Sequence, residues 1–113
     1  MLFLGLGTGL GSALVVEGLV LGLELAHLPY RRKRTFEDWV GTRGLERLGK
    51  KRWRAAVAEV VARLKAAMVA DEVVLGGGNV HKLETLPPGC RRGDNDRAFL
   101  GGARLWEPGW RVL

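Results

Sequence analysis

Two short glycine-rich segments contain the residues of this sequence that could bind a ligand through exposed backbone, the first of them a phosphate group. Residues 7–11 read Gly-Thr-Gly-Leu-Gly and lie between the apolar, strand-like segments 2–6 and 12–16. A glycine turn between two strands exposes backbone N–H groups, and a concave set of such groups can hold an anion. A plain hairpin without a ligand fits the same pattern, so residues 7–11 alone leave both interpretations open.

The segment that follows residues 7–11 excludes the two commonest phosphate-binding loops. A Rossmann fingerprint opens a helix, whose N-terminus then faces the pyrophosphate, but a strand-like segment follows here. A Walker A loop ends in Gly-Lys followed by Ser or Thr, which residues 7–11 lack. The remaining ligand-binding interpretation is a β-hairpin phosphate loop that includes the Thr8 hydroxyl.

The second glycine-rich segment, Gly76-Gly77-Gly78, directly follows the strand-like residues 72–75. Ligands of open α/β sheets bind at the carboxyl ends of strands, and glycines there allow a flat ring or a ribose to lie on the backbone. A flexible turn after the strand is the simpler interpretation of this segment taken alone. Its combination with residues 7–11 favours a ligand site.

Glu24 and His27 stand three residues apart and could bind the hydroxyl groups of a polar ligand. The glutamate would accept hydrogen bonds, and the histidine could donate or accept them. An exposed surface pair is the commoner meaning of this spacing. A metal site is not expected, because no second histidine or cysteine lies nearby and the chain has one cysteine, Cys90.

Hydrophobic patterns predict the elements that must position these residues. Apolar runs predict three antiparallel strands in a meander. Thr35 with Asp38 three residues later resembles a capping box and predicts the start of a helix. Gly41 and Gly44 weaken that helix and could break it, whereas residues 50–69 carry the clearest helical periodicity. The predicted elements are strands 2–7, 12–17, 19–21, 72–75 and 90–92, an irregular loop 22–29, helices 35–48 and 50–69, a helical turn 79–84 and a final helix from Asp94. We therefore expect one α/β domain with a mixed sheet.

Composition restricts the class of protein. A chain of 113 residues fits one domain, and its single cysteine excludes an internal disulfide and a cysteine-rich zinc cluster. Residues 1–16 are uncharged, but their glycines, the missing basic n-region and the following Glu17 argue against a signal peptide or a membrane span. A reducing cytoplasm is the expected setting.

Positive charge is concentrated in residues 31–65, which contain 12 of the 18 basic and 4 of the 12 acidic residues, a balance of +8. Such a block attracts polyanions, among them polyphosphate, nucleotides and nucleic acid. A solvated helix face would have the same composition. Nucleic acid is not the expected partner, because the sequence has no zinc finger, aromatic RNA-binding motif or clear recognition helix.

The order of these motifs resembles the ROK family of sugar kinases and sugar-responsive repressors, which belongs to the actin-like, hexokinase-like ATPases. That family's pattern is Gly-Thr-Gly-Ile/Leu-Gly, a short hairpin, Glu-x-Gly-His, a strand followed by Gly-Gly-Gly, and a final Ala/Gly-rich helix. This chain has residues 7–11, 24–27, 76–78 and 94–106 in the same order. The branch that includes polyphosphate glucokinase, which lacks the family's cysteine zinc cluster, is the most similar.

The resemblance implies a ribonuclease H-like fold and a role for each motif. Residues 1–113 would form a single domain equivalent to the C-terminal lobe of a ROK-type glucokinase, without the N-terminal lobe. Such an enzyme transfers a phosphoryl group from ATP or polyphosphate, with Mg²⁺, to a hexose hydroxyl. The implied site residues are Gly7, Thr8, Gly9 and Gly11 for the donor phosphates, Gly76, Gly77 and Gly78 for the nucleotide, and Glu24 and His27 for the sugar. Ala26 replaces the family's glycine, and without the family's cysteines His27 is not expected to bind zinc.

The same resemblance implies that catalysis needs residues outside these 113. The family's first lobe supplies another phosphate loop and the aspartate that deprotonates the sugar hydroxyl, and neither is found in this sequence. We therefore expect no catalytic residue here and little or no kinase activity from this chain alone. Its partner would be an N-terminal lobe or a second copy of the chain. Two alternatives remain open: a non-enzymatic dimerising or interaction module, and a polyanion binder that uses residues 31–65.

Overall fold

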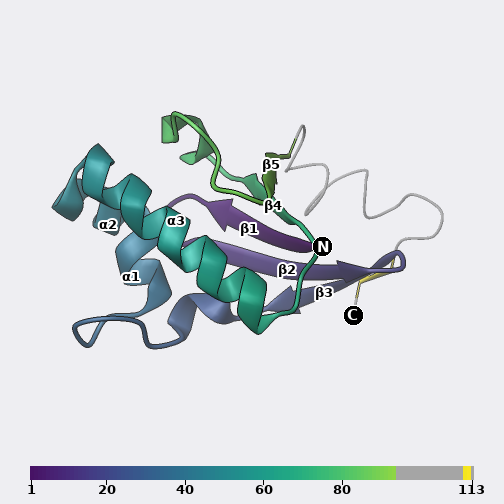
Figure 1. The fold of residues 1–113 in the computed structure, drawn as a ribbon. Helices are drawn as coiled ribbons and strands as arrows, with labels where there is room; N and C mark the ends of the chain where they lie inside the picture. The colour runs from purple at the N-terminus through teal and green to yellow at the C-terminus, as the bar shows by residue number, and fades with distance from the viewer. Residues whose placement is uncertain (94–110, 113) are drawn as a thin grey trace.

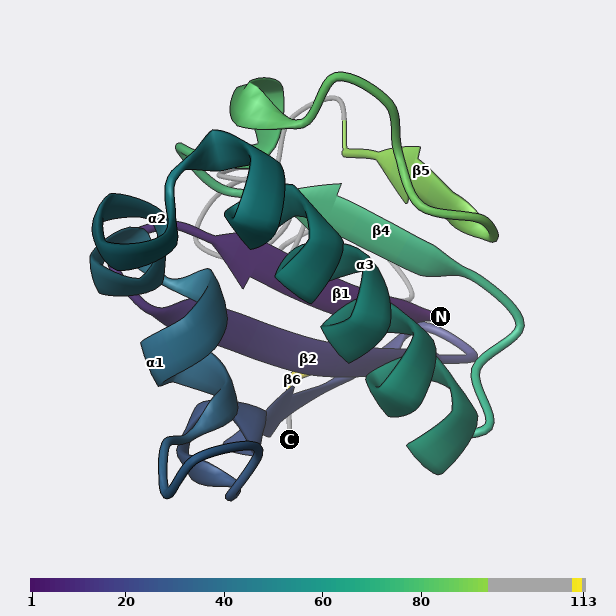
Figure 2. The same ribbon diagram turned by 60° about the vertical axis from the view of Figure 1, so that its left-hand side comes forward.

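The fold is built on a mixed six-stranded β-sheet, and three helices cover one of its faces (Figures 1 and 2). The computed structural model describes residues 1–93 and 111–112. The strands are β1 (Leu2–Leu6), β2 (Leu10–Val16), β3 (Leu19–Leu23), β4 (Val73–Gly76), β5 (Cys90–Arg92) and β6 (Arg111–Val112), in the order β5-β4-β1-β2-β3-β6. The helices are α1 (Phe36–Val40), α2 (Thr42–Leu48) and α3 (Lys50–Ala67), with short 3₁₀ turns η1 (Leu25–His27) and η2 (Val80–Lys82).

The centre of the sheet places the amino-terminal hairpin beside β4. β1 and β2 are antiparallel, with Gly5 opposite Gly11, and β2 pairs with β3 in the same sense. β4 lies parallel to β1 on its other side, so the chain crosses back over the sheet through the three helices. Because the carboxyl ends of parallel strands meet at one edge, both glycine-rich segments begin there. The predicted meander and mixed sheet are confirmed.

Local signals set the helix boundaries. Thr35 Oγ1 accepts a hydrogen bond from the Asp38 N–H at 3.2 Å, and Asp38 Oδ2 accepts one from the Thr35 N–H at 2.9 Å, which confirms the capping box. Gly41 ends α1 and precedes α2, so the helix expected over 35–48 is in fact two helices. The break lies against the glycine turn, since a Cβ at Gly41 would be 2.7 Å from the Thr8 carbonyl oxygen.

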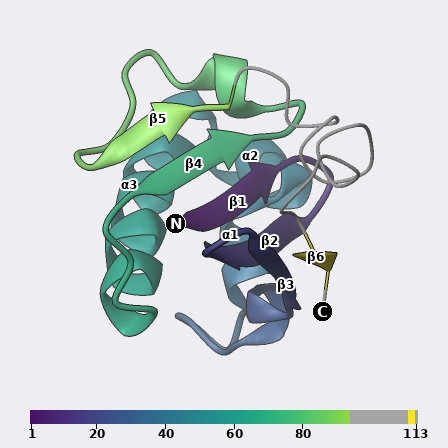
Figure 3. The same cartoon turned by 90° about the vertical axis from the view of Figure 1, so that its right-hand side faces the viewer.

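Helix α3 supplies much of the core on the covered face of the sheet. Its apolar side chains recur every three or four residues and so form one continuous face. The almost completely buried members are Trp53, Val57, Val60, Val61 and Leu64. Leu2, Leu4 and Leu6 of β1 pack in the same cluster, whereas Phe3 belongs to a second, smaller cluster on the opposite face. Figure 3 shows the sheet with its strands in front of the helices.

Several predicted boundaries are wrong by a few residues. β3 continues to Leu23, and the 3₁₀ turn η1 lies within the irregular loop expected over 22–29. Gly11 lies within β2 and not in the turn, because its backbone pairs with that of Gly5. The helical turn expected over 79–84 is the shorter η2. The helix expected from Asp94 lies outside the described residues.

Loss of the capping box is expected to lower stability in a pH-dependent way. Thr35→Ala should reduce the free energy of unfolding by about 1 kcal/mol, because the Asp38 N–H loses its acceptor. Hydrogen bonds from the backbone and side chain of Thr35 hold the pKa of Asp38 below its usual range, so folding favours the carboxylate. Asp38→Asn should therefore be destabilising at neutral pH, and its difference from wild type should shrink as the pH falls through the Asp38 pKa of the folded protein. Urea titrations across this pH range measure both effects, and a constant difference for Asp38→Asn would contradict the capping role.

Candidate functional site

The glycine turn after β1 has a surface made of backbone atoms. β1 ends at Leu6 and β2 begins at Leu10, so Gly7, Thr8 and Gly9 form the connection, and the Gly7 N–H donates to Gly9 O at 3.1 Å. Thr8 is exposed, and among the described residues neither its N–H nor that of Gly9 has a protein acceptor. Successive unpaired N–H groups at a turn are an arrangement that binds anion oxygens.

Two elements hold this turn in position. The Gly7 carbonyl oxygen accepts hydrogen bonds from the Thr42 N–H and hydroxyl, both at 3.1 Å, and from Asn79 Nδ2 at 3.3 Å. Asn79 is buried, its side chain also donates to Thr42 Oγ1 at 3.1 Å, and its N–H donates to Leu6 O at 2.8 Å. Because buried polar groups are costly unless paired, the start of α2 and the loop after β4 fix the turn firmly. Sequence patterns did not predict either side chain.

Gly77 brings the second glycine-rich segment against the turn. It follows β4 with a φ of +90°, and a Cβ there would lie 2.6 Å from Leu6 N and 2.7 Å from Leu6 C. Only glycine fits, because the left-handed φ and the β1 backbone both exclude a side chain. Gly76 pairs with Gly5 inside the sheet, whereas Gly78 is exposed and its Cβ would meet nothing within 4 Å. Close packing therefore explains Gly77, and Gly78 has the open surroundings that contact with a ligand requires.

An open cavity of about 370 Å³ joins the two glycine-rich segments. Its lining comes from β1, the glycine turn, β2, α1 and the residue after β4, and consists of Phe3, Gly5, Gly7, Gly9, Leu10, Gly11, Glu37 and Gly77. Phe3 alternates along β1 with the core residues Leu2 and Leu4, so this part of the cavity lies on the face opposite the helices. A Cβ at Gly7 or Gly11 would meet nothing within 4 Å, which leaves room for a ligand.

Glu37 is the one charged side chain that lines this cavity among the described residues, and the sequence did not predict it. Its Oε1 accepts a hydrogen bond from the Leu10 N–H at 3.1 Å. A Cβ at Gly9 would overlap the same carboxylate, so the contact depends on a glycine there. Glu37 lies in the first turn of α1, where acidic residues are common because they interact favourably with the helix dipole. Nothing else in its sequence context indicates a functional role. Its carboxylate would repel a bound phosphate unless a cation lay between them.

Glu24 and His27 do not line the cavity, and they lie at the 3₁₀ turn η1. His27 Nε2 is 3.9 Å from Glu24 Oε2, and the two side chains are 71% and 88% exposed, respectively. Ser12 of β2 positions this turn, because its Oγ donates to Leu23 O at 3.0 Å and accepts from the Leu25 N–H at 3.4 Å. The structure thus brings together residues from segments 7–11 and 76–78, but the Glu24–His27 pair does not line the cavity that joins them.

No group of three or more histidine, cysteine, aspartate or glutamate side chains that could hold a metal ion occurs within residues 1–93 and 111–112. Over the same part of the chain, no helix combines the length and apolar character needed to cross a bilayer. A divalent cation at the glycine cavity would have Glu37 as its nearby carboxylate. Most of its ligand oxygens would have to come from a bound phosphate donor and water, as Mg²⁺ commonly requires.

The mixed sheet with helices on one face resembles one lobe of an actin-like ATPase. In particular, the chain is similar to the crystal structure of an inorganic polyphosphate/ATP-glucomannokinase from Arthrobacter sp. strain KM, with a TM-score of 0.73 and 22% sequence identity. The similarity covers 93% of this chain and 45% of that chain, so the chain spans about half the length of that kinase. No protein-family model and no curated protein matches the sequence. At this level of identity the comparison establishes the fold, and function must be argued from the site.

Proposed function

We propose that this chain is the donor-binding lobe of a sugar kinase resembling the ROK family, in which a phosphoryl group passes from ATP or polyphosphate to a hexose hydroxyl. The observation that carries the proposal is the cavity in which the turn 7–9 and Gly77 meet at the carboxyl ends of β1 and β4. Ligands of open α/β sheets bind at this edge. The fold similarity to a polyphosphate/ATP-glucomannokinase supports the same classes of donor.

The residues at the cavity fit the phosphates of such a donor. The Thr8 and Gly9 N–H groups and the Thr8 hydroxyl would donate hydrogen bonds to phosphate oxygens, which are strong when the acceptor is charged. Gly7 and Gly11 leave the space in which the phosphates would lie. Gly78 would contact the nucleoside when the donor is ATP. Mg²⁺ bound with the donor would offset phosphate charge beside the Glu37 carboxylate.

The acceptor sugar would bind at η1. Glu24 and His27 carry the hydrogen-bonding groups that recognise hydroxyls, and their exposure leaves both accessible. A pair this exposed holds a sugar weakly by itself, because water competes for every hydrogen bond. The sugar would therefore be bound between this surface and a second surface, which the other lobe of the kinase would supply.

Activity of this chain alone is expected to be close to background. Phosphoryl transfer depends on positioning and on a base or orienting group, and general-base catalysis contributes roughly 10²–10⁴-fold. The family resemblance assigns both the base and the first phosphate loop to the other lobe. What this chain contributes is donor binding, so donor binding is the property to test, and robust glucose phosphorylation by the chain alone would contradict the division of roles.

Gly11→Val should block the cavity while leaving the fold intact. A Cβ at Gly11 meets open space and valine suits a strand, so the free energy of unfolding should stay within about 0.5 kcal/mol of wild type. Mg-ATP or tripolyphosphate should shift the Thr8 and Gly9 amide resonances of wild-type protein, and Gly11→Val should weaken that binding about tenfold because the side chain occupies the ligand's space.

Gly22→Val is the matched control for this experiment. Gly22 lies in β3, is exposed, and has nothing within 4 Å of its Cβ position, but it does not line the cavity. Its substitution should leave donor binding unchanged. If millimolar donor fails to move the Thr8 and Gly9 resonances of wild-type protein, the donor site is assigned to the wrong place.

A further inference from the structure

Residues 31–34 form a tight turn whose two central side chains do not suit its backbone. The Arg34 N–H donates to Arg31 O at 2.9 Å, and Arg32 and Lys33 have φ values of 50° and 59°. Positive φ at both central positions is typical of a type I′ turn, which favours Asn-Gly and strains longer side chains. Backbone strain of this kind often marks a functional position, so the two cationic side chains are candidates for binding an anion.

Beside this turn, a hollow of about 260 Å³ lies between the turn and α3. Arg31, Arg32 and Arg52 line it, together with one acidic residue, Glu59. Glu59 pairs with Arg31 and also, at 3.1 Å, with Arg63, so its charge is already balanced. Arg32 and Arg52 are exposed and form no ion pair within the described part of the chain. The hollow is therefore cationic, with two arginines available to an anion.

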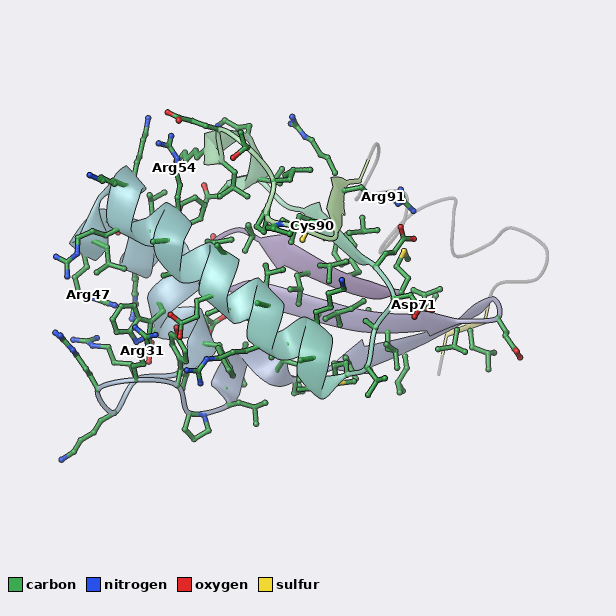
Figure 4. The ribbon with its side chains drawn as sticks, viewed as in Figure 1. Arg31, Arg47, Arg54, Asp71, Cys90 and Arg91 are labelled. Atoms are coloured by element: carbon green, nitrogen blue, oxygen red, sulfur yellow. The ribbon has the colours of Figure 1, made fainter. Side chains whose placement is uncertain are left out.

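The aromatic rings at this hollow are already engaged by arginines. The guanidinium carbons of Arg31 and Arg63 lie 5.0 and 5.2 Å from the Tyr30 ring centroid, and that of Arg47 lies 5.5 Å from the Trp39 ring. Figure 4 shows Arg31 and Arg47 at the same end of the molecule. Single-stranded nucleic acids bind by stacking bases on free aromatic faces, whereas here guanidinium groups already lie over both rings. The rings orient guanidinium groups, and the hollow suits a ligand made of phosphate groups alone.

We propose that this hollow binds inorganic polyphosphate and anchors the part of the polyphosphate that lies outside the glycine cavity. The inference rests on the proposed function and names the donor that this surface favours. Helix α1 separates the two sites, since Glu37 lines the glycine cavity and Trp39 lines the hollow. A helix with its side chains is about 10–12 Å across, so a long polyphosphate reaches both sites, whereas the triphosphate of ATP is too short. The hollow would thus select polyphosphate over ATP.

A double variant, Arg32→Asn with Lys33→Gly, separates the effect of charge from that of folding. Asn-Gly is the preferred pair for this turn, so the Tm should rise by a few degrees. The affinity for long-chain polyphosphate should fall about tenfold with a shallower salt dependence, because cationic contacts are lost. The affinity for Mg-ATP should change by less than about twofold, since distant surface charges are screened. Arg52→Ala, which alters α3 and not the turn, should also weaken polyphosphate binding.

Arg91→Ala with Arg92→Ala is the charge-matched control. These residues lie on β5, and Arg91 is at the opposite end of the molecule from Arg31 in Figure 4. This control should weaken polyphosphate binding by less than about twofold. Equal losses in the two double variants would show a non-specific attraction and overturn the proposal. A single-stranded RNA oligonucleotide that binds as tightly, with the same dependence on Arg32, would overturn it as well.

Two variants distinguish failure of the polyphosphate subsite from failure of the donor site. If Gly11→Val loses Mg-ATP binding while the Arg32→Asn, Lys33→Gly variant keeps its full affinity for polyphosphate, the anchoring subsite is wrong and the donor lobe stands. If Gly11→Val keeps Mg-ATP binding, the proposed donor site itself is wrong, whatever the hollow binds.

Discussion

Trp53→Ala is expected to reduce the free energy of unfolding by about 3–5 kcal/mol. Trp53 is completely buried on α3, and its Nε1–H donates to the Val40 carbonyl oxygen at 3.0 Å. Alanine would leave a cavity beneath α3 and a buried carbonyl at the end of α1 without its donor. Because domains of this size are stable by about 5–15 kcal/mol, the variant would be close to the limit of folding.

Urea denaturation followed by circular dichroism measures this loss, with Trp53→Phe as the comparison. Phenylalanine keeps most of the apolar volume but cannot donate to Val40, so its expected cost is about 1–3 kcal/mol. The difference between the two variants then reports the cavity. A Trp53→Ala protein within about 1 kcal/mol of wild type would show that α3 does not pack on the sheet as the structure describes.

Gly77→Ala is expected to cost about 2–4 kcal/mol and to distort the donor site at the same time. The φ of +90° disfavours alanine, and its Cβ would lie 2.6 Å from Leu6 N. The obstacle is the backbone of β1, which cannot move without disturbing its pairing with β4. Asn79, two residues on, helps to hold the glycine turn, so the damage should extend to the Thr8 and Gly9 amides.

The neighbouring glycine supplies the control for this substitution. Gly78 is exposed, has no positive φ, and nothing lies within 4 Å of its Cβ position. Gly78→Ala should therefore leave stability unchanged or raise it by about 0.4–1 kcal/mol, because alanine restricts the unfolded chain. Amide spectra and urea titrations of both variants make the comparison. Similar losses at the two positions would mean that Gly77 does not contact β1 as described.

Local features of the fold could be predicted because their causes are local. The capping box at Thr35 and Asp38 depends on groups three residues apart, and the length of α3 follows from its apolar repeat. The break at Gly41 was open to either outcome, because it is decided by the contact with Thr8, which is distant in sequence. The end of β3 at Leu23 was misjudged for a similar reason, since its pairing partner is Ser12.

For this protein, the sequence by itself determined the meander, the helix boundaries near their caps, and the two glycine-rich segments as candidate ligand-binding sites. Only the tertiary structure decided that residues 7–9 and Gly77 meet, that Glu37 lines their cavity, and that Thr42 and Asn79 hold the turn. The physical reason is the parallel pairing of β1 with β4, which joins segments about 70 residues apart. Such pairing depends on long-range packing across the whole sheet, so no spacing within either segment encodes it.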